Sequence, residues 1–310
     1  MEPKPAAHAL PAWPLPAVVV NPIGVGNPAK LKTQITRVCV ELGWRAPLWL
    51  QTTVEDPGGG QAAAALAAGA DLVLVCGGDG TVRQVAQVLA GSGTPMGLLP
   101  TGTANLLARN LAIARCNPSR ATRVALCGKN RAVDVGRLFI DDRAEEHVFL
   151  VMAGMGFDAA IMTGAHHELK ARWGSLAYVV SGMRALTGLR ADITLAVDGR
   201  LELPRRVRAV VVGNCGRLIG GLVLMPAAKV DDGLLDVVTL GPRGIIGWLA
   251  VTARVLARRR EGHRIVQHWQ GRTVIISSET PQHAQLDGDP MGEVKGMRMT
   301  VDRGALLVRS

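Results

Sequence analysis

The first hundred residues alternate between short apolar runs and segments with helical spacing, and this rhythm most constrains the fold. Residues 72–76 (LVLVC) are apolar throughout and stop at the glycine-rich GGDGT of residues 77–81. A strand that is apolar at every position must be covered on both faces, as in a parallel sheet flanked by helices. We therefore predict an α/β N-terminal domain with strands at 17–20, 48–51, 72–76 and 96–99, and helices at 28–42, 60–68 and 81–89.

The pattern changes after about residue 129, where short alternating segments predict antiparallel strands. Asp198 and Gly199 lie between two such segments, which is a signal for a two-residue hairpin turn. We predict an α/β domain at 1–128 and a β-rich antiparallel sandwich or barrel at 129–296. The expected strands are 132–139, 147–153, 193–197, 208–212, 234–240, 273–277 and 297–301, with helices at 165–186 and 244–260. A cleft between two such domains is a common ligand site.

The formal net charge of +10 indicates an acidic partner, which is nucleic acid, an anionic membrane or a phosphate substrate. Only ten residues are Phe, Trp or Tyr, too few for base-stacking platforms, so no nucleic acid is predicted as a partner. The five cysteines show no CxxC pairing and fit free thiols in a reducing cytoplasm. No apolar run reaches about 18 residues, so we expect a soluble, cytoplasmic protein.

The GGDGT turn combines glycines with one acid at the carboxyl end of a predicted strand. Gly77, Gly78 and Gly80 allow backbone N–H groups to approach a phosphate, whereas Asp79 alone would repel it. With Mg²⁺ between them the arrangement becomes attractive, because Mg²⁺ binds carboxylate and phosphate oxygens together. The alternative is that Asp79 or Thr81 only caps the next helix. The sequence GVGNPA at 24–29 also fits a dinucleotide fingerprint, but no acid follows at the end of the second strand, so a Rossmann cofactor is not expected.

A second glycine element follows the fourth predicted strand, in the sequence LLPTGTAN at 98–105. Short polar side chains flank its glycine. If the sheet is parallel, this loop emerges at the same edge as GGDGT. Two such loops predict a phosphate site to which Thr101, Gly102, Thr103 and Asn105 contribute.

Several motifs occur in one order along almost the whole chain: NP at 21–22, GGDGTV at 77–82, LLPTGTANLLARNL at 98–111, AGMGFDA at 153–159, PAAKVDDGLLDV at 226–237 and QLDGD at 285–289. Together they resemble the diacylglycerol kinase/sphingosine kinase-like lipid kinases of the bacterial diacylglycerol kinase catalytic-domain type. GGDGT alone is shared with NAD kinases and phosphofructokinases. The resemblance implies that the domain at 1–128 binds the nucleotide, that the domain at 129–296 holds the lipid acceptor, and that the strands at about 297–310 return to the first domain. It also implies ATP and Mg²⁺ in the cleft and a lipid hydroxyl as the acceptor.

The resemblance also implies roles for single residues. Asp79 would engage the catalytic Mg²⁺, and Asp289 would take the proton of the acceptor hydroxyl, although the family's more usual residue there is Glu. Leu106 stands where many relatives have an acid. A structural Mg²⁺ would be held by the carbonyls of Lys229 and Leu234 and the carboxylate of Asp232, unless this segment is only a polar turn. The implied nucleotide-binding residues are Asn21, Gly77, Gly78, Gly80, Thr81, Thr101, Gly102, Thr103 and Asn105.

The segment 244–264 has one apolar face and ends in Arg254, Arg258, Arg259 and Arg260. Such a helix can lie on an anionic lipid surface, so we expect a peripheral protein of the inner membrane face, or else a core-packed helix with a solvated basic end. The sequence leaves open whether the protein forms a homodimer. The competing functions are an NAD-type kinase and a nucleotide or lipid sensor without catalysis.

Overall fold

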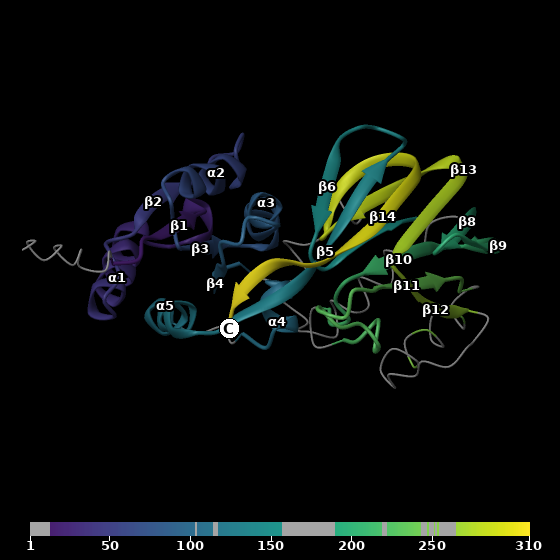
Figure 1. Cartoon of the computed structure of the whole chain (residues 1–310). Coiled ribbons are helices and arrows are strands. Elements are labelled where there is room, and N and C mark those ends of the chain that lie inside the picture. The colour runs from purple at the N-terminus through teal and green to yellow at the C-terminus, as the bar shows by residue number, and fades with distance from the viewer. Residues whose placement is uncertain are drawn as a thin grey trace, which may run out of the picture.

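The structure is a computed structural model that describes residues 13–102, 104–113, 117–156, 190–218, 222–242, 247, 251, 253 and 265–310. Figure 1 shows a helix-flanked part built from the N-terminal residues beside a β-rich part built from the rest of the chain. Both belong to one connected sheet with the strand order β12-β11-β10-β7-β13-β14-β4-β3-β1-β2. The predicted fold class, an α/β part followed by a β-rich antiparallel part, is confirmed.

The N-terminal part is a parallel sheet with helices on both faces. Its strands are β1 (Pro16–Val20), β2 (Leu48–Gln51), β3 (Leu72–Gly77) and β4 (Met96–Pro100), and every residue of β1 and β3 is buried. One face packs against α2 (Gly59–Ala67) and α3 (Asp79–Leu89). The other packs against α1 (Pro28–Glu41) and α5 (Pro118–Cys127). The continuous apolar runs of the sequence are therefore explained by burial on both sides.

Helix α5 was not predicted, although its start carries a clear signal. Asn117 accepts a hydrogen bond from the N–H of Arg120, and Pro118 occupies the first helical position. An Asn cap followed by Pro is a common helix start, because Pro has no N–H to leave unpaired there. Helix α1 begins in the same way at Asn27 and Pro28.

The β-rich part is antiparallel. The Asp198-Gly199 hairpin is confirmed, since both residues have positive φ (49° and 77°) and Val197 pairs with Arg200. The predicted helix 165–186 lies outside the described residues, as does 244–260 apart from residues 247, 251 and 253. The strands are β5 (Asn130–Ile140), β6 (Glu146–Phe149), β7 (Met152–Met155), β8 (Ala191–Val197), β9 (Arg200–Val207), β10 (Ala209–Gly213), β11 (Leu235–Leu240), β12 (Val266–Gly271), β13 (Thr273–Leu286) and β14 (Asp289–Arg309).

The single strand predicted at 147–153 was wrong, because the chain forms β6 and β7 with a break at Leu150 and Val151. Strand β6 pairs with β5, whereas β7 pairs with β10 and β13. The N–H groups at the break donate to the carboxylate of Asp287 instead of to a neighbouring strand. The apolar composition of this segment gives no sign of the break.

Strand β14 joins the two parts. It pairs antiparallel with β13 and β5, and its last residues pair parallel with β4, Val308 with Met96 and Arg309 with Gly97. A register shift between Asp302 and Leu306, with Gly304 at φ 63°, redirects the strand toward the N-terminal sheet. In Figure 1 β14 runs in yellow from the β-rich part to the label at the C-terminus.

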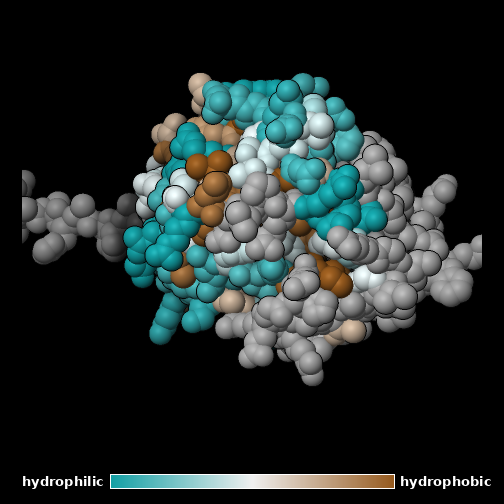
Figure 2. Space-filling view, turned by 90° about the vertical axis from the view of Figure 1, so that its right-hand side faces the viewer, coloured by the Kyte–Doolittle hydropathy of each residue, from teal (hydrophilic) through white to brown (hydrophobic). Residues whose placement is uncertain are grey.

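The face in Figure 2 shows hydrophobic residues in separate groups between hydrophilic ones, where it is not grey. Within the described residues, no helix has the length and apolar character needed to cross a membrane.

Candidate active site

Three loops meet at the carboxyl edge of the parallel sheet. The N–H of Asn21, after β1, donates to the carbonyl of Cys76 at 2.9 Å, and the N–H of Gly102, after β4, donates to the carbonyl of Gly77 at 3.3 Å. A Cβ on Gly102 would lie 2.6 Å from the Cα of Gly78, so only glycine allows these two loops to touch. The two predicted phosphate loops are therefore in direct backbone contact.

Asp79 connects the two glycine loops. It is the first residue of α3, and its Oδ1 accepts a hydrogen bond of 2.6 Å from the N–H of Leu106, where α4 (Leu106–Asn110) begins. Helix α3 is capped by Gly78 without a side-chain hydrogen bond, so Asp79 does not cap the helix that it begins, and its carboxylate binds the first N–H of α4 instead. Burial raises the pKa of Asp79, the backbone N–H groups of Leu106 and Asn105 oppose this, and the nearby charge of Asp289 adds to it.

The polar residues of the second loop are arranged around Gly102. Asn105 adopts a left-handed backbone (φ 45°), and its Nδ2 donates to the carbonyl of Gly102 at 2.8 Å. The hydroxyl of Thr101 is buried and has no hydrogen-bond partner in the structure. A buried hydroxyl without a partner is costly, so it is a group that a bound ligand would satisfy. Thr103 lies outside the described residues.

The first loop is short and tight. The side chain of Asn21 accepts from the N–H of Ile23 at 3.0 Å and caps the 3-10 turn η1 (Pro22–Gly24). A Cβ on Gly24 would come within 3.7 Å of the Thr101 hydroxyl, which places this loop beside the second glycine loop. Asn21 thus supports the shape of the site through its Oδ1.

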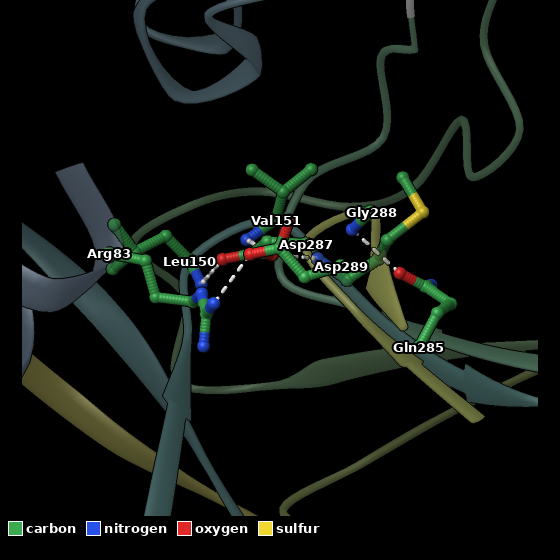
Figure 3. Close-up of polar contacts among 8 residues, drawn as sticks. Arg83, Leu150, Val151, Gln285, Asp287, Gly288 and Asp289 are labelled. Atoms are coloured by element: carbon green, nitrogen blue, oxygen red, sulfur yellow. Dashed lines mark hydrogen bonds and ion pairs between the residues drawn. The ribbon is translucent and has the colours of Figure 1, made fainter. Parts of the chain in front are cut away.

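A hairpin from the β-rich part reaches the same place. Asp287 and Gly288 form its two-residue turn with positive φ (49° and 94°), and the turn connects β13 to β14. The carboxylate of Asp287 is buried and accepts hydrogen bonds of 2.9 Å from the N–H groups of Leu150, Val151 and Met152 (Figure 3). Burial raises the pKa of Asp287 to about 6, although these hydrogen bonds and the charge of Arg83 act in the opposite direction.

Asp289 begins β14 and points toward helix α3. Its Oδ2 lies 2.6 Å from Nη2 of Arg83, whose side chain is only 9% exposed, whereas that of Asp289 is 53% exposed. Figure 3 shows Arg83 reaching from its helix toward the carboxylates of the hairpin. The Nε of Arg83 is buried and has no hydrogen-bond partner among the described residues. A Cβ on Gly80 would lie 3.5 Å from Oδ2 of Asp289. The hairpin carboxylate is thus held next to the first glycine loop.

Sequence reasoning missed Arg83 and the role of Asp287. Arg83 follows Asp79 by four residues, so both project from the same face of α3, and this spacing could have identified it. Asp287 has no comparable local signal, because its three donors lie about 136 residues away. The site therefore holds three carboxylates, of Asp79, Asp287 and Asp289, and one guanidinium. Asp287 is engaged by three backbone N–H groups and Asp289 by Arg83, so the three carboxylates do not form a metal-ligand cluster within the described residues.

The predicted structural metal site belongs to a different turn, which precedes β11. Oδ1 of Asp232 accepts from the N–H of Leu234 at 3.1 Å. The turn is held by Asp134, whose buried carboxylate accepts from the N–H of Gly233 at 2.6 Å and whose own N–H donates to the carbonyl of Val230 at 2.7 Å. No group of three or more His, Cys, Asp or Glu side chains suited to a metal occurs within the described residues. A site of two carbonyls and one carboxylate needs no such group, so it stays a prediction.

Two family models match this chain, one over its α/β part and one over most of its β-rich part. The family model of the diacylglycerol kinase catalytic domain matches residues 16–138, and that of the YegS C-terminal NAD kinase beta sandwich-like domain matches residues 151–309. This chain belongs to the YegS-like lipid kinase family. The predicted resemblance is confirmed, and the carboxylate cluster lies where the two matched parts of this family member meet.

Single relatives agree with this assignment. The diacylglycerol kinase of Mycobacterium tuberculosis is 36% identical over 178 residues, which are 56% of this chain and 56% of that enzyme, so the match spans little more than half of its length. The Pseudomonas aeruginosa protein named Probable lipid kinase YegS-like is 33% identical over 260 residues, covering 79% of this chain and 78% of that protein. The crystal structure of a Bacillus anthracis diacylglycerol kinase has a TM-score of 0.71 at 19% identity and 96% coverage of both chains, which supports the fold.

Proposed function

We propose that this protein is an ATP-dependent lipid kinase that transfers the γ-phosphoryl group to the hydroxyl of a lipid alcohol. The observation that carries the proposal is the position of Asp289 beside the first glycine loop, which itself contacts the second, in a chain of this lipid kinase family. The glycine loops offer backbone N–H groups to phosphate oxygens, and the hairpin brings a half-exposed carboxylate beside them.

The nucleotide would bind along the edge formed by the three loops. The N–H groups of the 77–81 loop at the start of α3 favour an anion, because they have no partners within the helix. The unpaired hydroxyl of Thr101 supplies one further donor. The carboxylate of Asp79 offers oxygen atoms, which are the ligands that Mg²⁺ prefers. It is largely buried and already oriented by the N–H of Leu106, so it could serve as one ligand of a phosphate-bound Mg²⁺. When bound, that ion would neutralise charge on the transferring phosphate.

Asp289 is the proposed general base. It lies beside Gly80, and therefore beside the expected phosphates, and its exposed side leaves room for the acceptor hydroxyl. Asp289 is shorter than the Glu that is more usual at this position, so it must reach the hydroxyl from a fixed position. The ion pair with Arg83 holds it there. Such positioning matters more than basicity for a base that takes a proton late in phosphoryl transfer.

The acceptor class follows from the family and not from a pocket in the structure. Diacylglycerol, sphingoid bases and related lipid alcohols all present a hydroxyl on an apolar body. We propose that the protein reaches such substrates as a peripheral protein on the inner membrane face, with a role in phospholipid biosynthesis.

The test is incubation of the full chain with γ-labelled ATP, Mg²⁺ and a total lipid extract, followed by identification of the labelled lipid. Asp289→Asn should lower kcat by about 10²- to 10⁴-fold with little change in ATP affinity. Asp79→Asn keeps an oxygen for the N–H of Leu106 and should still lose at least about a hundredfold in rate. Asp142→Asn, at an exposed turn outside the site, is the matched control and should behave like the wild type.

The same assay separates the competing functions. Label on NAD and on no lipid would identify an NAD-type kinase. Binding of ATP-Mg²⁺ without transfer to any acceptor would identify a sensor. A wild-type rate in Asp289→Asn would remove this residue as the base, and a wild-type rate in Asp79→Asn would remove the metal role.

A further inference from the structure

A second concave site lies beside the turn that precedes β11, and none of the glycine-loop residues lines it. It encloses about 400 Å³, which is within the range of small-molecule sites. Its walls come from the end of α4, the start of β5, the loop at 216–217 and the segment 223–231. The pocket is therefore built by three regions of the chain, near residue 110, near residue 131 and between residues 216 and 231.

Its charge is positive. Arg131, Arg217 and Lys229 all line it, with Asp231 as the acidic residue. Asp231 is engaged by Arg131, at 2.8 Å from its Nη2. Arg217 and Lys229 are exposed, and neither makes an ion pair within the part of the chain that the structure describes. Two cations at one concavity without a carboxylate partner favour an anionic ligand.

Arg217 is held in place by a reciprocal contact with Asn110, the last residue of α4. Oδ1 of Asn110 accepts from the N–H of Arg217 at 3.0 Å, and its Nδ2 donates to the carbonyl of Arg217 at 3.0 Å and to that of Leu106 at 2.9 Å. The backbone N–H and the carbonyl of Arg217 are thus both held by the side-chain amide of Asn110. A pre-positioned backbone reduces the entropy lost when the side chain binds a ligand.

The backbone beside Lys229 is also held by hydrogen bonds. The next residue, Val230, is buried, and its carbonyl accepts from the N–H of Asp134. The Asp134 carboxylate binds the N–H groups of Gly233 and Gly304, so the turn is attached to both β5 and β14. Met225 and Ala228 add apolar surface to the lining of the pocket.

We propose that this pocket binds the phosphate group of an anionic ligand through Arg217 and Lys229. A guanidinium binds phosphate oxygens in a bidentate manner and an ammonium adds a point charge, so the pair suits a phosphate ester. The source is either the headgroup of an anionic phospholipid or a soluble phosphate ester. Because α4 starts at the N–H that binds Asp79 and ends at the residue that holds Arg217, the pocket is one short helix from the carboxylate cluster. The site is distinct from the proposed transfer site, and its test does not require kinase activity.

The experiment measures binding of the full chain in two arms. One arm uses phosphatidylcholine vesicles with and without phosphatidic acid, and the other titrates glycerol 3-phosphate in solution. The test variant is the double substitution Arg217→Ala and Lys229→Ala. The control is Arg143→Ala with Lys295→Ala, which removes the same charges from exposed positions at the far end of β5 and β14. We expect the test variant to lose at least about tenfold in affinity for the probe that the wild type binds, and the control to lose much less.

The outcomes separate the sources and can overturn the proposal. Loss confined to phosphatidic acid vesicles assigns a lipid headgroup, and loss in the glycerol 3-phosphate arm assigns a soluble ester. Equal losses in test and control variants would show general surface charge and refute the pocket, as would no loss or no binding by the wild type. Asn110→Ala keeps every charge and should still weaken binding several-fold, because Arg217 is no longer held; unchanged binding there would contradict the geometric argument.

Discussion

Asp287→Asn should change how the stability of the protein depends on pH. Burial raises the pKa of Asp287 from its usual 3.8 to about 6, so the folded protein keeps a proton there that the unfolded chain releases. The stabilisation from this proton is complete below about pH 4 and is lost as the pH rises through about 6. Asn cannot titrate, so the variant lacks this contribution at every pH.

The size of the effect follows from the two pKa values. The interval between 3.8 and about 6 corresponds to about 3 kcal/mol in the free energy of unfolding. The wild type should therefore exceed Asp287→Asn in stability by about 3 kcal/mol more at low pH than at neutral pH. The other carboxylates change the free energy of unfolding of both proteins equally with pH. The difference in stability between the two proteins therefore reports on Asp287 alone.

The assay is urea unfolding of both proteins at about pH 4 and about pH 7. The reasoning fails if the stability difference between the proteins is the same at both pH values, or larger at neutral pH. Failure would mean that the three N–H donors at 150–152 stabilise the carboxylate enough to offset its burial.

Three further substitutions test other parts of the structure. Gly102→Ala places a Cβ 2.6 Å from the Cα of Gly78. It should lower the free energy of unfolding by about 1–3 kcal/mol in thermal unfolding, and it should weaken nucleotide binding. The control for stability is Gly26→Ala, whose Cβ would meet no atom within 4 Å. Arg83→Met removes the partner of Asp289 and should lower kcat at least about tenfold with little change in ATP affinity; Arg83→Lys should recover part of the rate, and equal losses in both variants would contradict the ion-pair role. Asp134→Ala leaves the buried N–H of Gly233 and the partly buried N–H of Gly304 without an acceptor and should cost at least about 1–3 kcal/mol in urea unfolding. A value near zero would show that water replaces the carboxylate.

The parallel half of the fold could be predicted because each of its signals is local. Continuous apolar runs mark the buried strands, and the glycine loops at their carboxyl ends must share one edge of the sheet. The convergence of the 77–81 and 98–105 loops follows from topology alone. The Asp198-Gly199 hairpin is equally local.

The rest of the site depends on contacts between distant parts of the chain. Arg83 and Asp289 are 206 residues apart, and Asp287 binds N–H groups about 136 residues away. The break between β6 and β7 exists because those N–H groups turn to a side chain, which no local pattern in 147–153 records. Sequence spacing can show that Asp79 and Arg83 share a helix face, but not which carboxylate they meet.

The course of β14 has a consequence for the synthesis of the protein. Strand β4 keeps an open edge until residues 308–309 have been made, since these residues are its partners on the side away from β3. The N-terminal sheet, although its first four strands emerge early, is thus completed last. An open edge of a hydrophobic parallel sheet is a template for association with other chains. Premature termination before residue 300 would leave that edge exposed on an otherwise assembled α/β layer, and we expect such fragments to be captured by chaperones or to aggregate.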